Sequence, residues 1–266
     1  MAERTATLPE YKHVVFKKSP LELCVAQVRY PPVPGFPEDD LALRLRKAMK
    51  KDFPFSALEH TMNLVVTPQG VHQSQGNATW RLTDLSKRWS VVVGEDNVTV
   101  ETRKYSSFEE LVTRTVSAIE MVGQALEISH QTRVGLRYVN EIRHDEGETY
   151  KTWTKLLAPD LLGVSRANLL GGEVEQTIAE ARARRSDGSL LIRHGFLKGT
   201  TIAAPNQAPP KQSSFYLLDL DYFNEETEEY GAGLKERLIA YHSVIYRIFR
   251  WAIGEGDLYR SLGATE

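Results

Sequence analysis

Cysteine is the scarcest residue in this chain of 266 residues, which contains only Cys24. A single thiol excludes an intramolecular disulfide and a structural zinc site built on several cysteines. Cys24 lies in the apolar stretch "LELCVAQV", where we expect it to be a small buried side chain.

Long apolar runs are also missing. No segment approaches the roughly 18 consecutive apolar residues that a membrane-spanning helix needs. The first residues, "MAERTATLPEYKHVVF", lack the apolar core of a signal peptide. We therefore expect a soluble cytoplasmic protein that does not use the membrane as a partner.

The chain has no excess of charge of either sign. Its 33 Lys and Arg against 35 Asp and Glu give a net charge of −2, which disfavours a nucleic-acid partner because such proteins usually present a basic face. The strongest local basic stretch is "LRLRKAMKK" (43–51), with Arg44, Lys47, Lys50 and Lys51. Nearby acids such as Asp52 favour a solvated helix face over a contact with phosphates.

Motifs of the well-known catalytic classes are absent as well. The sequence contains no Gly-x-Ser-x-Gly, no Walker loop, no Gly-x-Gly-x-x-Gly and no His-Glu-x-x-His. Its seven histidines show no spacing to one another or to acids that specifies a metal. These absences favour a non-enzymatic protein without a cofactor.

What the chain does contain is two halves of similar design. Apolar periodicity predicts the order strand, helix, antiparallel strands and long helix in each half. In the first half the elements are 21–30, 37–53, 61–67, 77–85, 89–95, 97–105 and 106–128. In the second half they are 132–142, 150–162, 168–185, 189–199, 215–224 and 232–254. Ser107 and Glu110 have the spacing of a capping box at the start of the first long helix.

This order predicts an α+β fold with an internal duplication. The repeats span about 19–128 and 129–254, with short tails at both ends. We expect a single domain in which the two repeats form one pseudo-symmetric curved sheet, backed by the two long helices. The oligomeric state does not follow from this pattern.

Four segments, "SPLELCVAQVRYPP", "LRYVNEI", "LDLDYF" and "AYHSVIYRIFRWAI", occur in the chain in this order. They resemble an uncharacterised, sporadically distributed prokaryotic family of about 250 residues. Its marks are an Arg-aromatic-Pro-Pro first strand, a Leu-Arg-Tyr-x-Asn central strand and a Leu-Asp-x-Asp-x-Phe late strand. The resemblance implies no activity, and sporadic occurrence implies an accessory role such as defence or a toxin–antitoxin pair.

The repeated Arg-Tyr dipeptide supplies the first candidate site. Alternation in a strand places Gln27 and Arg29 on one face, opposite Tyr30. It places Arg137 away from Tyr138 in the same way. If the two first strands lie near the pseudo-symmetry axis, Arg29 and Arg137 converge and bind a small anionic ligand or a protein partner. The alternative is that each arginine pairs with an acid of a neighbouring strand or lies on a solvated face.

Paired acids supply an alternative site. Asp219 and Asp221 share one face of a predicted strand, and Glu173 and Glu175 have the same spacing. Carboxylates on neighbouring strands can hold Mg²⁺ or Mn²⁺ against a phosphate. The alternative function is therefore a divalent-metal-dependent phosphohydrolase or nucleotide-processing enzyme with these four residues as catalytic groups.

Overall fold

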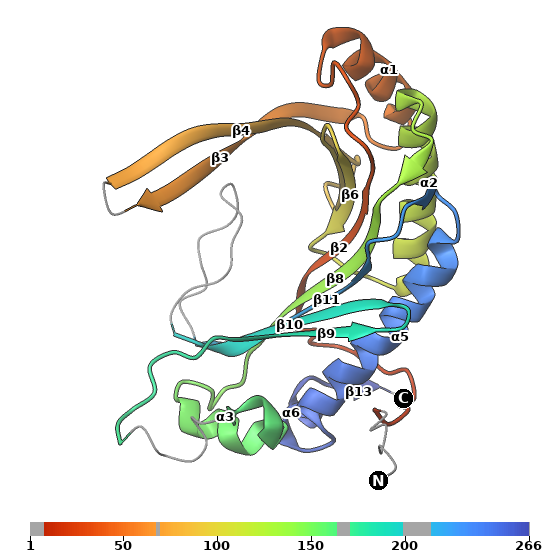
Figure 1. Ribbon diagram of the computed structural model, residues 1–266. Coiled ribbons are helices and arrows are strands. Elements are labelled where there is room, and N and C mark those ends of the chain that lie inside the picture. Colours follow the sequence, from red (N-terminus) through yellow and green to blue (C-terminus); the bar gives the residue numbers. More distant parts are fainter. Residues whose placement is uncertain (1–7, 68–69, 164–170, 199–213, 266) are drawn as a thin grey trace. The chain divides into compact units, whose positions relative to one another are not determined.

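The computed structural model describes residues 8–67, 70–163, 171–198 and 214–265 and has an α+β fold (Figure 1). Its described part contains a large antiparallel sheet and five helices. The α+β class predicted from the sequence is thereby confirmed. None of these helices is long and apolar enough to cross a membrane.

The elements follow the predicted order along the chain. The helices are α1 (Asp39–Met49), α2 (Phe108–Leu126), α3 (Tyr150–Leu156), α5 (Leu234–Ile253) and α6 (Asp257–Ser261), with a 3₁₀ turn η1 (Pro159–Leu161). The strands of the large sheet are β2 (Leu21–Arg29), β3 (Phe55–Thr67), β4 (Gly70–Thr83), β5 (Trp89–Val93), β6 (Asn97–Thr102), β8 (Arg133–Ile142), β9 (Ala179–Arg185), β10 (Gly188–Leu197) and β11 (Phe215–Asn224). Two further pairs are β1 (Val15–Phe16) with β13 (Ala264–Thr265), and β7 (His130–Gln131) with β12 (Glu228–Glu229).

The chain divides into two compact units. Unit 1 comprises Met1–Glu22, Arg137–Tyr222 and Ala240–Glu266, and unit 2 comprises Leu23–Leu136 and Phe223–Ile239. These boundaries fall within β2, β8, β11 and α5, so they do not coincide with the predicted repeats. The single domain made of two repeats stays a prediction.

Unit 2 contains the strand order β3-β4-β5-β6-β2, with every pair antiparallel. Ala26, Val28 and Tyr30 are buried, as the alternation in β2 predicts. Helices α1 and α2 lie side by side against one face of this sheet (Figure 1). Helix α2 starts as the capping spacing predicts, because the Ser107 hydroxyl accepts a hydrogen bond from the Glu110 N–H at 3.2 Å.

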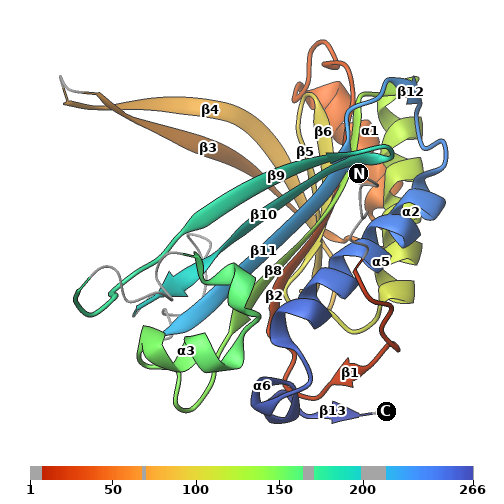
Figure 2. The same ribbon diagram turned by 60° about the horizontal axis from the view of Figure 1, so that its bottom comes forward.

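Unit 1 contains the strand order β8-β11-β10-β9. Tyr138 of β8 is buried and its hydroxyl lies 2.9 Å from His242 Nδ1 of α5. Tyr222 of β11 packs against Tyr241 of the same helix, with ring centroids 4.6 Å apart and ring planes tilted by 32°. Figure 2 shows α5 running alongside these strands. Because side chains alternate along β8, Arg137 lies on the sheet face away from α5.

Candidate functional site

The predicted ligand-binding residues of β2 differ in their surroundings. Gln27 Oε1 accepts a hydrogen bond from Arg133 Nη1 at 3.0 Å, and Gln27 Nε2 donates to Thr99 Oγ1 at 3.1 Å. Arg29 is exposed at the strand end, and no described residue forms a polar contact with its guanidinium. Gln27 therefore links three strands of unit 2, while Arg29 faces solvent.

Arg137 belongs to a closed group of charges in unit 1. Its Nε and Nη2 donate to Asp219 Oδ1 and Oδ2, each at 2.7 Å. The Asp219 side chain is 4% exposed and that of Arg137 is 40% exposed. The hydrogen bonds to Asp219 raise the pKa of the Arg137 guanidinium above its ordinary value, against the effect of burial. The pair matches the alternative in which this arginine meets an acid of a neighbouring strand.

Two further residues extend this group. Arg193 Nη1 lies 3.8 Å from Asp219 Oδ2, and Arg193 Nε donates to Glu180 Oε2 at 2.6 Å. We call Arg137, Asp219, Arg193 and Glu180 the sheet cluster. Arg29 belongs to unit 2 and Arg137 to unit 1, and the convergence of these two arginines stays a prediction.

The predicted acid site is not assembled as expected. Glu173 and Glu175 precede β9 and lie on no strand, and Glu173 pairs with Lys198 at 3.6 Å. Before β9, the chain still contacts β10: the Thr177 N–H donates to the Phe196 carbonyl at 2.9 Å, and a Cβ on Gly195 would lie 1.9 Å from the Thr177 carbonyl oxygen. The expectation that these two glutamates stand on the sheet is wrong.

The remaining acids do not fit the divalent metal of the alternative function. Both oxygens of Asp219 accept hydrogen bonds from Arg137, and the charge of Asp221 also acts on that arginine. Within the described ranges, no three His, Cys, Asp or Glu side chains are grouped to hold a metal ion. We therefore derive no step through Mg²⁺ or Mn²⁺.

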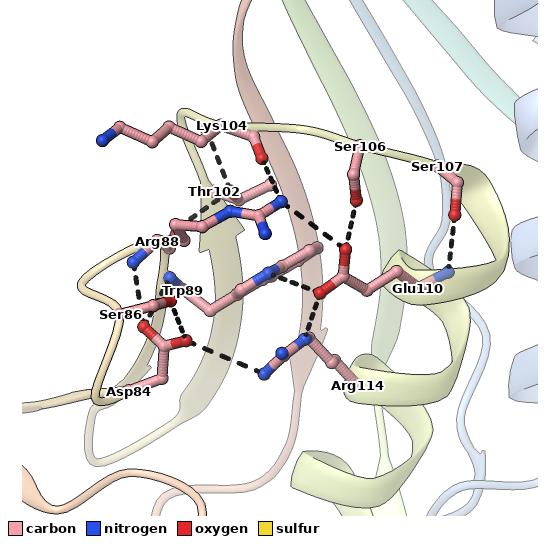
Figure 3. Close-up of polar contacts among 10 residues, drawn as sticks. All are labelled: Asp84, Ser86, Arg88, Trp89, Thr102, Lys104, Ser106, Ser107, Glu110 and Arg114. Carbon is pink, nitrogen blue, oxygen red and sulfur yellow. Dashed lines mark hydrogen bonds and ion pairs between the residues drawn. The ribbon is translucent and has the colours of Figure 1, made fainter.

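A second group of charged residues, in unit 2, stabilises the turn between β4 and β5 (Figure 3). Asp84 is 5% exposed. Its Oδ1 accepts from the N–H groups of Arg88 and Trp89 at 2.9 and 3.1 Å, and its Oδ2 accepts from the Ser86 hydroxyl at 2.6 Å. Burial alone would raise the pKa of Asp84, but these hydrogen bonds outweigh it, so that the pKa lies below its ordinary value.

Glu110 joins this turn to the first turn of α2. Its Oε1 accepts from Trp89 Nε1 at 3.2 Å and from Arg114 Nε at 2.9 Å, and its Oε2 lies 3.6 Å from Arg88 Nη2. A hydrogen bond from Ser106 and the charge of Arg114 lower the pKa of Glu110 despite its partial burial. We call Asp84, Arg88, Glu110 and Arg114 the brace.

The brace forms one wall of an open cleft of about 980 Å³. Leu85 at its margin is 78% exposed. Charges of both signs line this cleft: Lys51, Arg88 and Arg114 with Asp52, Asp84, Glu109 and Glu110. Since the four carboxylates outnumber the three cations, the cleft has no net attraction for an anion.

A smaller groove of about 280 Å³ lies between α1, the start of β3 and the end of β4. Arg46, Lys47 and Lys50 line it, together with apolar side chains and Ser56, and no carboxylate is among the lining residues. We call it the basic groove. Its apolar lining consists of Leu43, Phe53, Pro54 and Leu82. The Arg46 guanidinium stacks over Trp80, 5.2 Å from the ring centroid.

Comparison with known proteins gives no information on the function of this chain. No protein-family model matches the chain, and no curated protein sequence matches it. The candidate sites therefore depend on geometry and charge alone.

Proposed function

We propose that this chain is a non-enzymatic binding protein that recognises an anionic ligand or a protein partner. The observation that carries this proposal is the basic groove, where three cations and no carboxylate surround an apolar floor. In a chain with a net charge of −2, such a local excess of positive charge attracts an anionic group. The exposed apolar residue Leu43 beside the cations favours a ligand that also has apolar groups.

The groove is better suited to this function than the arginines of the sheet. Arg137 already directs two donors to a buried carboxylate, so an anion would have to compete with Asp219 at hydrogen-bond distance. Lys47 and Lys50 are exposed and have no polar partner among the described residues. The binding of a ligand or partner by Arg29, Gln27 and Arg137 stays a prediction.

We further propose the finer features that the sequence predicts. The same order of elements occurs twice, as β2, α1, β3 to β6 and α2, and then as β8, α3, β9 to β11 and α5. This order supports an internal duplication that yields one curved, pseudo-symmetric sheet. A cytoplasmic accessory role, in defence or as part of a toxin–antitoxin pair, is compatible with a binding protein.

Thermal unfolding with tripolyphosphate and with polyglutamate tests the proposal. A ligand at ten times its Kd stabilises the folded state by about 1.4 kcal/mol, which raises Tm by about 4 °C in a chain of this size. The double substitution Lys47→Glu, Lys50→Glu should abolish the shift. The matched control Lys151→Glu, Lys155→Glu, on the exposed face of α3, should keep it. An unchanged Tm with both anions, or equal loss in both variants, would refute the proposal.

A further inference from the structure

The basic groove lies beside an open sheet edge. Strand β3 stands at the end of the strand order and pairs, among the described strands, with β4 alone. Ser56 of β3 and Leu82 of β4 are register partners, and both line the groove. A strand added outside β3 would therefore run along the groove, and every second side chain would face α1.

The part of this edge beside the groove lacks most of the features that usually prevent strand addition, and the register shift of β3 lies beyond it, between His60 and Met62. Natural edge strands are short or contain lysine, proline or inward-pointing charges. Strand β3 has 13 residues, with no Lys, Arg or Pro. Phe55 and Leu58 are 45% and 44% exposed, so large apolar side chains lie on both faces of this edge.

Charge selects the kind of strand that fits. The three cations of the groove have no carboxylate among the groove's lining residues, and residues 60–80 contain no Asp, Glu, Lys or Arg. An incoming strand with acidic residues on its α1 side would supply the missing negative charge. Cross-strand pairs of opposite charge stabilise a sheet, whereas like charges destabilise it.

We propose that β3 and the basic groove bind an extended acidic segment of a partner protein, which adds to the sheet as a further antiparallel or parallel strand. This inference rests on the proposed function and names its partner. Backbone hydrogen bonds to β3 give affinity, and alternate acidic side chains contact Arg46, Lys47 and Lys50. Apolar side chains at the intervening positions of the segment lie on the opposite face of the sheet and cover the exposed Phe55.

Two other occupants fit less well. A second copy of this chain would offer its own β3, whose one acid, Glu59, already binds Arg81 at 2.8 Å. A nucleic acid would use the three cations but would leave the backbone groups of the edge and the exposed Phe55 on the opposite face uncovered. An acidic polypeptide uses the cations, the backbone edge and the apolar residues together.

Fluorescence anisotropy with a labelled peptide of alternating glutamate and valine tests the inference. The peptide should bind the full chain, and N-methylation of alternate amides should weaken binding about tenfold, because it removes backbone donors but no charge. Lys47→Glu, Lys50→Glu should weaken binding about tenfold or more, and Lys151→Glu, Lys155→Glu should not. Hydrogen exchange of the Ser56–Leu58 amides should slow when the peptide is bound.

The outcomes separate this inference from the proposed function. If the N-methylated peptide binds equally well, strand addition is wrong while anion binding stands. If tripolyphosphate binds and the peptide does not, the polypeptide partner is wrong. Tighter binding of single-stranded oligo(dT) with the same dependence on Lys47 and Lys50 would assign the groove to nucleic acid. If no anion binds, both proposals fail.

Discussion

The sheet cluster and the brace use the same side chains for different tasks. In the sheet cluster, one carboxylate that is 4% exposed depends on a single bidentate arginine, and its second arginine lies 3.8 Å away. In the brace, the carboxylates of Asp84 and Glu110 accept from backbone N–H groups, hydroxyls and an indole as well as from arginines. In the sheet cluster the buried carboxylate of Asp219 has one close partner. In the brace each carboxylate has several hydrogen-bond donors.

The difference predicts how each cluster responds to the loss of one member. Removing one partner of a buried ion pair is costly because the remaining charge is left without compensation. Where several donors share a carboxylate, each deletion removes only its own hydrogen bond. We therefore expect the largest effect in the sheet cluster.

Arg137→Ala should lower the free energy of unfolding by about 3 kcal/mol, because Asp219 stays buried without its bidentate partner. Urea unfolding followed by circular dichroism measures the change. Arg193→Ala is the matched control and should cost less than about 1 kcal/mol, because Arg193 lies 3.8 Å from Asp219 and its closer partner, Glu180, is exposed. Equal losses in the two variants would show that the buried charge is not concentrated on Arg137.

Asp84→Ala should cost about 2 kcal/mol, because it leaves the N–H groups of Arg88 and Trp89 without their acceptor. The loss also releases a turn in which Lys87 has a left-handed conformation, with φ of 54°. Asp84→Asn keeps an acceptor oxygen and should cost about half as much. If both variants are equally unstable in urea, the charge of Asp84 matters more than its hydrogen bonds.

The smallest expected effect is the pH dependence of the brace. The pKa values of Asp84 and Glu110 are lowered in the folded state, so the unfolded state takes up protons first as the pH falls. Their stabilisation is complete above about pH 5 and is lost as the pH falls through the lowered folded values. Glu110→Gln should reduce the loss below pH 5 by about 1 kcal/mol or less. Glu120→Gln, which removes an exposed carboxylate of the same helix outside the brace, is the matched control.

Part of the sheet cluster could be predicted from the sequence, because side chains alternate along a strand. The period of two placed Arg137 opposite Tyr138, and it placed Asp219 on one face of its own strand. Pairing of arginine with a strand acid was among the stated alternatives. The acid comes from β11 because β11 lies next to β8 in the sheet. The order of strands in a sheet cannot be read from a single sequence.

Neither the brace nor the basic groove could be predicted from the sequence, and the reasons differ. Capping spacing identified the N-terminus of α2 and Glu110, but its partners Asp84 and Arg88 lie in a turn whose shape has no periodic signal. The groove arises from the placement of α1 against the edge of the sheet. Lys47 and Lys50 lie on an exposed helix face, as predicted, but the sequence alone does not show that they line one groove together with Leu82.

Cys24 gives the protein a built-in chemical reporter. The only thiol of the chain lies in β2 and is 0% exposed, so an alkylating reagent can reach it only when unit 2 opens. The rate of alkylation thus measures that opening without any substitution. A cysteine introduced by Lys51→Cys, at an exposed position next to the groove residue Lys50, would be modified first, and a dye attached there would report on binding with little background from the native thiol.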